Sequence, residues 1–138
     1  MQTYFDTVRD TDLTFGGRSS RRDYWTFTLV NTLVTLTLWV LVADSLLAAS
    51  AQEKTPSFVS SILLLLTLTY SVGMFLPTLS VTIRRLHDGG DSGGVMIVWL
   101  LPFIGGLILL WLLARRGQPG SNKWGPNPKG VQAPVNAF

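Results

Sequence analysis

Groups capable of chemistry are concentrated in the run from Arg84 to Gly94. This run holds two guanidinium groups, an imidazole, two carboxylates, a hydroxyl and four glycines. Arginine side chains assisted by glycine amides can bind a phosphate or another anion. The same residues can also anchor a membrane helix at its cytoplasmic boundary, with the arginines paired to the aspartates and the glycines turning the chain. Arginines at such a boundary require no further function, so the anchor is the simpler interpretation.

Part of this run has the form of a serine-protease motif. Residues 90–94 read GDSGG, as in the nucleophile loop of chymotrypsin-like enzymes. That chemistry needs a histidine base, an orienting carboxylate and an oxyanion hole on a scaffold of two β-barrels. The only histidine, His87, lies five residues from Ser92, and the chain is too short and its expected structure too helical for such barrels. We therefore expect no catalytic residue and no enzymatic activity; the alternative is a membrane-interface hydrolase that uses His87, Asp88 and Ser92.

The composition excludes several other kinds of site. The chain has 138 residues and no cysteine, which excludes disulfides, thiolate nucleophiles and iron–sulfur clusters. With one histidine, a metal site would need several carboxylates, so we expect no metal and no cofactor. The net charge of +3 does not indicate nucleic-acid binding, because the cations flank apolar stretches, where they meet lipid headgroups.

Three apolar stretches without charge or histidine make up about half of the chain. They cover residues 24–43, 58–83 and 95–114, which is 20, 26 and 20 residues. At about 1.5 Å of rise per residue, roughly 20 helical residues cross the ~30 Å hydrocarbon core of a bilayer. We therefore expect an all-α, polytopic transmembrane protein with one membrane domain. Its expected parts are a polar arm over 1–22, membrane helices over 23–47, 58–85 and 95–114, and an irregular tail over 115–138.

Local signals refine this scheme. Ser20 and Asp23 have the S-x-x-D form of a capping box, which predicts that the first helix begins near Arg21. Pro77 should kink the second helix, and the third should be kinked or broken near Pro102 to Gly106. Polar stripes on the first two helices predict hydrogen bonds between them. The arm could form a short amphipathic turn at the membrane surface or a frayed tail; its apolar residues are Tyr4, Phe5, Val8, Leu13 and Phe15.

Cations in the short flanks predict the orientation. The arm carries four arginines and the second loop carries Arg84 and Arg85, whereas the first loop carries only Lys54. The positive-inside rule therefore places the amino terminus and the second loop in the cytoplasm. Three complete crossings would leave the tail outside despite its four cations. A third segment that breaks and re-enters would return the tail to the inside, at the cost of non-helical backbone in lipid. We favour three crossings.

Four short signatures occur in a characteristic order: FGGRSSRRDYW at 15–25, RRLHD at 84–88 with Ser92 and Gly93, LPFIG at 101–105, and GSNKWGPNP at 120–128. Together they resemble the YhaH-like family of small bacterial inner-membrane proteins, called domain of unknown function 805, over roughly Leu13 to Pro128. Gly94 departs from the tryptophan that is usual there. The resemblance implies a multi-pass inner-membrane protein with a shared architecture, and it implies no mechanism.

The function that we expect is an interaction with lipids or proteins. Cations from the arm and the second loop should converge on the cytoplasmic face and bind anionic headgroups, and Asp23 or Asp88 should pair with an arginine of the other helix. Further candidate partners are a second copy of the chain and other membrane proteins. The alternative is a small-solute channel or transporter, which three helices could form only as an oligomer. The candidate headgroup-binding residues are Arg18, Arg21, Arg22, Arg84, Arg85, His87 and Asp88.

Overall fold

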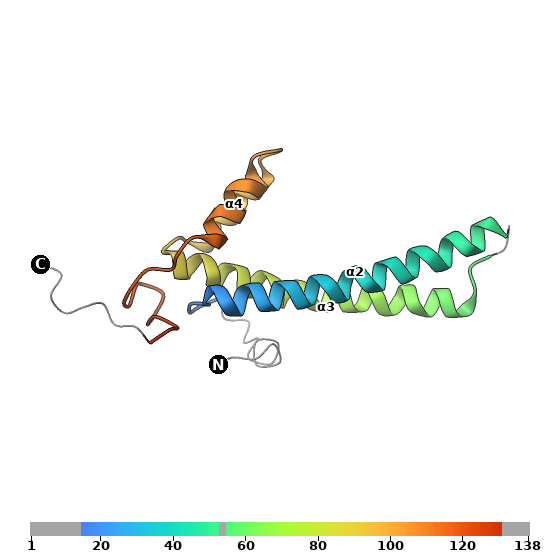
Figure 1. Cartoon of the computed structure of the whole chain (residues 1–138), viewed down its shortest axis with the longest axis horizontal. Helices are drawn as coiled ribbons and strands as arrows, with labels where there is room; N and C mark the ends of the chain where they lie inside the picture. Colours follow the sequence, from blue (N-terminus) through green and yellow to red (C-terminus); the bar gives the residue numbers. More distant parts are fainter. Residues whose placement is uncertain (1–14, 53–54, 131–138) are drawn as a thin grey trace, which may run out of the picture. The chain divides into compact units, whose positions relative to one another are not determined.

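The computed structural model describes residues 15–52 and 55–130. The regular elements within these parts are helices, with no strand among them, which confirms the expected all-α class. The elements, in chain order, are α2 (Arg21–Ala51), α3 (Phe58–Gly89), the 3₁₀-helix η1 (Gly93–Leu100) and α4 (Gly105–Ala114) (Figure 1). Contacts divide the chain into two units: one contains residues 28–76, and the other contains the described residues up to Phe27 and those from Pro77 onward. The amphipathic turn predicted for the arm lies outside the described residues, apart from Phe15.

Two helices have the length and composition of membrane spans. α2 has 31 residues and α3 has 32. Of the 18 most apolar consecutive residues in each, only 6% in α2 and 11% in α3 are buried, unlike the core helix of a soluble protein. At 1.5 Å per residue α3 is ~48 Å long, so it exceeds the ~30 Å hydrocarbon core. α3 is thus longer than a span requires, and its last turn lies beyond the charge-free stretch that ends at Ile83.

The capping residues predicted for α2 are present. The amide of Asp23 donates to Oγ of Ser20 at 3.3 Å, and the Ser20 hydroxyl donates to the Asp23 carboxylate at 2.7 Å. The carboxylate thus binds the serine hydroxyl and not the Ser20 amide that a capping box would use. The helix begins at Arg21, as the sequence indicated, and it extends to Ala51, beyond the predicted bound at residue 47.

Within the unit of residues 28–76, one contact of the predicted polar stripes joins the two helices. The Tyr70 hydroxyl donates to Oδ1 of Asn31 at 2.9 Å. Other hydroxyls in this unit bond within their own helix: Thr67 and Thr69 donate to the carbonyls of Leu63 and Leu65, four residues earlier. Thr67 and Ser71 of the stripe on α3 thus bond within their own helix, and the Tyr70–Asn31 bond matches the interhelical contact that we expected.

The third apolar stretch is not one helix. Eight residues form η1, residues 101–104 form a turn, and ten residues form α4. Figure 1 shows the chain doubling back at this turn, so that α4 runs beside η1. The break that Pro102 to Gly106 predicted is confirmed, whereas a membrane helix over 95–114 is not. α3 contains Pro77, as predicted, and it ends at Gly89 instead of at residue 85.

Gly105 permits the close approach of α4 to η1. A Cβ atom at Gly105 would overlap the carbonyl oxygen of Val98 and would lie 3.1 Å from that of Trp99, and backbone atoms cannot move aside cheaply. A Cβ at the next residue, Gly106, would meet nothing within 4 Å. The adjacent glycines therefore differ sharply in the space around them.

We expect Gly105→Ala to destabilise the turn by about 1–3 kcal/mol, the usual cost of overpacking. Gly106→Ala should be neutral or slightly stabilising, because alanine favours the helix. Thermal unfolding of both variants in detergent tests the difference. Equal melting temperatures for the two variants would contradict the packing described for Gly105.

Candidate functional site

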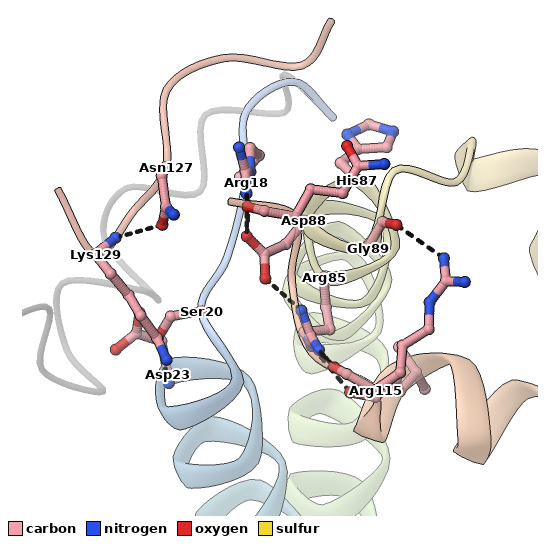
Figure 2. A network of polar contacts seen from close by, with 12 residues as sticks. Arg18, Ser20, Asp23, Arg85, His87, Asp88, Gly89, Arg115, Asn127 and Lys129 are labelled. Atoms are coloured by element: carbon pink, nitrogen blue, oxygen red, sulfur yellow. Dashed lines mark hydrogen bonds and ion pairs between the residues drawn. The ribbon is translucent and has the colours of Figure 1, made fainter. Parts of the chain in front are cut away.

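Asp88 lies at the centre of a polar cluster near the end of α3 (Figure 2). Its Oδ1 accepts hydrogen bonds from Nε of Arg18 at 3.1 Å and from Nη2 of Arg18 at 2.9 Å. Its Oδ2 accepts from Nη1 of Arg85. Arg18 comes from the arm, just before α2, while Arg85 and Asp88 are one turn apart on α3. We call these three residues the Asp88 cluster. We expected Asp88 to pair with an arginine of the first helix, and its partner Arg18 instead lies in the arm, three residues before that helix begins.

The Asp88 cluster is buried and carries one surplus positive charge. Arg18, Arg85 and Asp88 are 7%, 0% and 5% exposed. Backbone carbonyls accept further hydrogen bonds from both guanidinium groups. Arg18 donates to the carbonyls of Gln118 and Gly120, both at 2.7 Å, and Arg85 donates to those of Leu113, at 2.9 Å, and Arg115. Such charge-assisted bonds tie the tail and the end of α4 to α3.

His87 is the second anchor for the tail. Its ring stacks on Trp124, with centroids 3.6 Å apart and planes 3° from parallel. Nδ1 lies 3.1 Å from the carbonyl oxygen of Gly17, so Nδ1 carries the hydrogen of the neutral ring. Its backbone carbonyl accepts from Nδ2 of Asn122 at 2.9 Å. Burial lowers the pKa of His87 and nearby Lys123 lowers it further, while the bond to Gly17 opposes both effects.

The other predicted residues lie at the edge of this cluster or on the surface. The carbonyl of Arg84 accepts from the amide of Ser19 at 3.0 Å, which joins the arm to α3. Arg84 and Arg21 are half-buried, and Arg22 is exposed. The seven predicted residues therefore fall into two groups. Arg18, Arg85, His87 and Asp88 direct their polar groups into the protein, and Arg21, Arg22 and Arg84 remain accessible.

Sequence reasoning missed the tail as part of the site. Arg115 donates to the carbonyl of Gly89 at 2.9 Å and forms an ion pair with Asp91. The sequence predicts only an irregular tail over 115–138, because this part lacks periodicity. It is irregular, yet Gln118, Gly120, Asn122 and Trp124 all contact the arm or the end of α3. The available signal was the fourth signature, GSNKWGPNP, whose polar and aromatic residues include two of these contacts.

A small pocket of about 130 Å³ opens beside the Asp88 cluster. Three cations from separate segments line it, namely Arg21, Arg116 and Lys129. Gln118, Asn127 and Gly117 complete the wall together with Asp88, whose charge the two buried arginines already neutralise. Within residues 15–52 and 55–130, no group of three histidine or carboxylate side chains could hold a metal ion. The chemistry of the pocket favours an anion.

Comparison with known proteins identifies relatives over most of the chain. Residues 13–126 match the model of a family described as protein of unknown function, DUF805. The inner membrane protein YhaI of Escherichia coli K12 is 34% identical over 129 residues, covering 94% of this chain and 97% of the relative. The inner membrane protein YhaH of the same strain is 37% identical over 115 residues, covering 83% and 87%. No solved structure matches the chain.

The Asp88 cluster predicts that substitutions of Asp88 and Asp91 reduce the stability of the protein by very different amounts. Asp88→Asn would leave two buried guanidinium groups without a counter-charge, so it should cost about 3–5 kcal/mol of stability. Asp91→Asn breaks the half-exposed pair with Arg115 and should cost less than about 1 kcal/mol. Unfolding of the two variants in detergent measures the difference. Similar losses would contradict a dominant role for Asp88.

His87 predicts a pH dependence of stability. Its folded-state pKa is lower than the ordinary value of 6.5, so the unfolded chain binds the proton first as the pH falls. Its contribution to stability is therefore present above pH 6.5 and is lost as the pH falls towards the lowered value. We expect the melting temperature to decrease on acidification from about pH 7.5 to about pH 5. His87→Asn, whose amide can replace the bond to Gly17, should remove the part of the pH dependence of the melting temperature that His87 causes. If the variant has the same pH profile as the unchanged protein, other groups cause the dependence.

Proposed function

The chain belongs to the DUF805 family of proteins of unknown function, and we propose that it is a multi-pass protein of the bacterial inner membrane that binds anionic lipid headgroups at its cationic pocket, without performing chemistry. Its relatives YhaI and YhaH are inner membrane proteins of Escherichia coli. The observation that carries the proposal is the convergence of Arg21, Arg116 and Lys129 on one small pocket.

The pocket provides what a phosphate group requires. Guanidinium and ammonium groups supply charge and donors, and the side-chain amides of Gln118 and Asn127 offer further donors. Each cation near an anionic leaflet contributes about 1 kcal/mol, so three give a useful and salt-sensitive affinity without deep enclosure. Arg116 is also the second residue after the last apolar stretch, at the depth where phospholipid headgroups are expected.

The structure changes which cations we assign to this role. The predicted headgroup-binding set included Arg18, Arg85, His87 and Asp88, whose polar groups are occupied by internal contacts. In the proposal these four residues position the tail, so that Arg116 and Lys129 come to lie near Arg21. Arg22 and Arg84 remain accessible and strengthen the surrounding positive field.

Two contacts support a role that does not involve catalysis. A hydrolase based on Ser92 would need the imidazole of His87 as a proton acceptor. One face of that imidazole lies against Trp124, and its Nδ1 is bound to Gly17. Ser92 is exposed, at the start of η1. The proposed activity therefore depends on the cations and not on the serine.

Arg116→Gln with Lys129→Gln should weaken binding of phosphatidylglycerol or cardiolipin. Two cations at about 1 kcal/mol each correspond to a loss of roughly 30-fold. A matched control is Arg22→Gln with Lys123→Gln, which removes the same charge from exposed residues that do not line the pocket. Binding to nanodiscs is measured with phosphatidylglycerol, cardiolipin or phosphatidylcholine.

The control pair should reduce binding only by the general charge effect, several-fold less than the pocket pair. Equal losses of lipid binding for both pairs would mean that diffuse surface charge, and not the pocket, binds the headgroups. Unchanged binding in the pocket pair would contradict the proposal. Both double variants should unfold in detergent at the same temperature as the unchanged protein, which shows that the binding of folded proteins is compared.

A further inference from the structure

We propose that residues 93–114 form a re-entrant hairpin embedded in a single leaflet of the bilayer, with acyl chains covering its surface and the tail returning to the side on which the arm lies. The proposal commits to lipid as the occupant of this apolar surface. It does not depend on headgroup binding at the cationic pocket.

Both ends of the segment are fastened at the same place. It leaves the end of α3 just after Asp91, whose amide donates to the carbonyl of Leu86 at 3.1 Å. It returns at Arg115, which donates to the carbonyl of Gly89 at 2.9 Å and pairs with Asp91. Arg85 of α3 also donates to the carbonyl of Leu113, in the last turn of α4. The segment therefore starts and finishes beside the same turn of α3.

The surface of the hairpin is suited to hydrocarbon. No charged residue occurs between Gly93 and Ala114. Phe103, at the turn, is 97% exposed, and many other large apolar side chains of the segment are also exposed. Trp111 lies near the base, where the guanidinium of Arg115 is 5.8 Å from its ring, an arrangement typical of the boundary between headgroups and acyl chains. The exposed large apolar residues include Ile97, Trp99, Leu100, Leu101, Ile104, Leu107 and Leu110.

The hairpin is too short to cross the bilayer. Ten residues of α-helix are ~15 Å long, and eight residues of 3₁₀-helix are ~16 Å long. Each arm thus reaches about half of the ~30 Å hydrocarbon thickness. A hairpin with its base among the headgroups would place Phe103 near the middle of the bilayer.

The turn reduces the main cost of placing irregular backbone in lipid, which is unpaired amide groups. The amides of Leu101, Ile104 and Gly105 donate to the carbonyls of Val98, Pro102 and Leu101, at 3.0, 2.8 and 3.0 Å. Pro102 has no amide hydrogen. Four of the five residues from 101 to 105 therefore present no free N–H group to the acyl chains.

The charge distribution also fits a returning tail. Arg18 of the arm donates to the carbonyls of Gln118 and Gly120, so the arm and the tail are in direct contact. All the cations of the described tail therefore lie on the side of the arm, in agreement with the positive-inside rule. The three complete crossings that we favoured from the sequence would separate these partners by the thickness of a membrane.

Single cysteines in the full-length protein test the topology, since the chain has none of its own. We choose four exposed residues: Gly16, Thr55, Ser92 and Ser121. In intact cells, cysteines at 16, 92 and 121 should all be shielded from a membrane-impermeant maleimide, and one at 55 should react. Reaction at 121 and 55 together, with 92 shielded, would mean a third crossing and would overturn the proposal.

Depth-dependent fluorescence quenching tests whether acyl chains cover the hairpin. A fluorophore on Phe103→Cys, in vesicles, should be quenched at least two-fold more by lipids brominated deep in the acyl chain than by lipids with a quencher on the headgroup. A fluorophore on Ser121→Cys should show the reverse order and serves as the control. A probe at 103 that neither lipid quenches would indicate that a second copy or another protein covers the hairpin, and this would overturn the assignment to lipid.

Discussion

One carboxylate shared by two buried guanidinium groups holds together the polar end of this protein. Burying a charge without a partner costs several kcal/mol, so Arg18 and Arg85 can be buried only because Asp88 lies between them and backbone carbonyls accept their other hydrogens. These carbonyls belong to the end of α4 and to the tail. The arm, α3, α4 and the tail therefore meet at a single charged contact, and the cationic pocket is formed beside it.

The distribution of buried residues is the reverse of that in a soluble domain. Among the described residues the largest fully buried side chain is that of Arg85, while Phe58 and Phe103 are 80% and 97% exposed. In a bilayer, leucine and phenylalanine gain little by packing on each other, because the lipid around them is equally apolar. Polar contacts, close backbone approaches and van der Waals packing then decide the structure. The Asp88 cluster, the Tyr70–Asn31 bond and Gly105 are each examples of such contacts.

Much of the fold could be predicted because its signals are local. Charge-free stretches identify α2 and α3, Ser20 identifies the start of α2, and Pro102 with two glycines identifies the break. The site could be predicted only in part. Arg84 and Arg85 are adjacent in sequence, yet Arg85 is fully buried and Arg84 is half-buried, because successive residues of a helix point about 100° apart. Which of them faces inward depends on the carbonyls of Leu113 and Arg115, 28 and 30 residues away, and no local pattern reveals such partners.

The contacts of Arg18 have a consequence for biosynthesis. Its acceptors, from Asp88 to Gly125, follow it by 70 to 107 residues, so the ribosome makes nearly the whole protein before this arginine can complete its bonds. During that time the side chain must remain hydrated, although α2 is already available for insertion into the membrane. A chain terminated before Gly117 would leave Arg18 without the carbonyls of Gln118 and Gly120 that accept its hydrogen bonds. Incomplete chains would thus expose a charged, unassembled end to the proteases that survey new membrane proteins, whereas the finished chain conceals it.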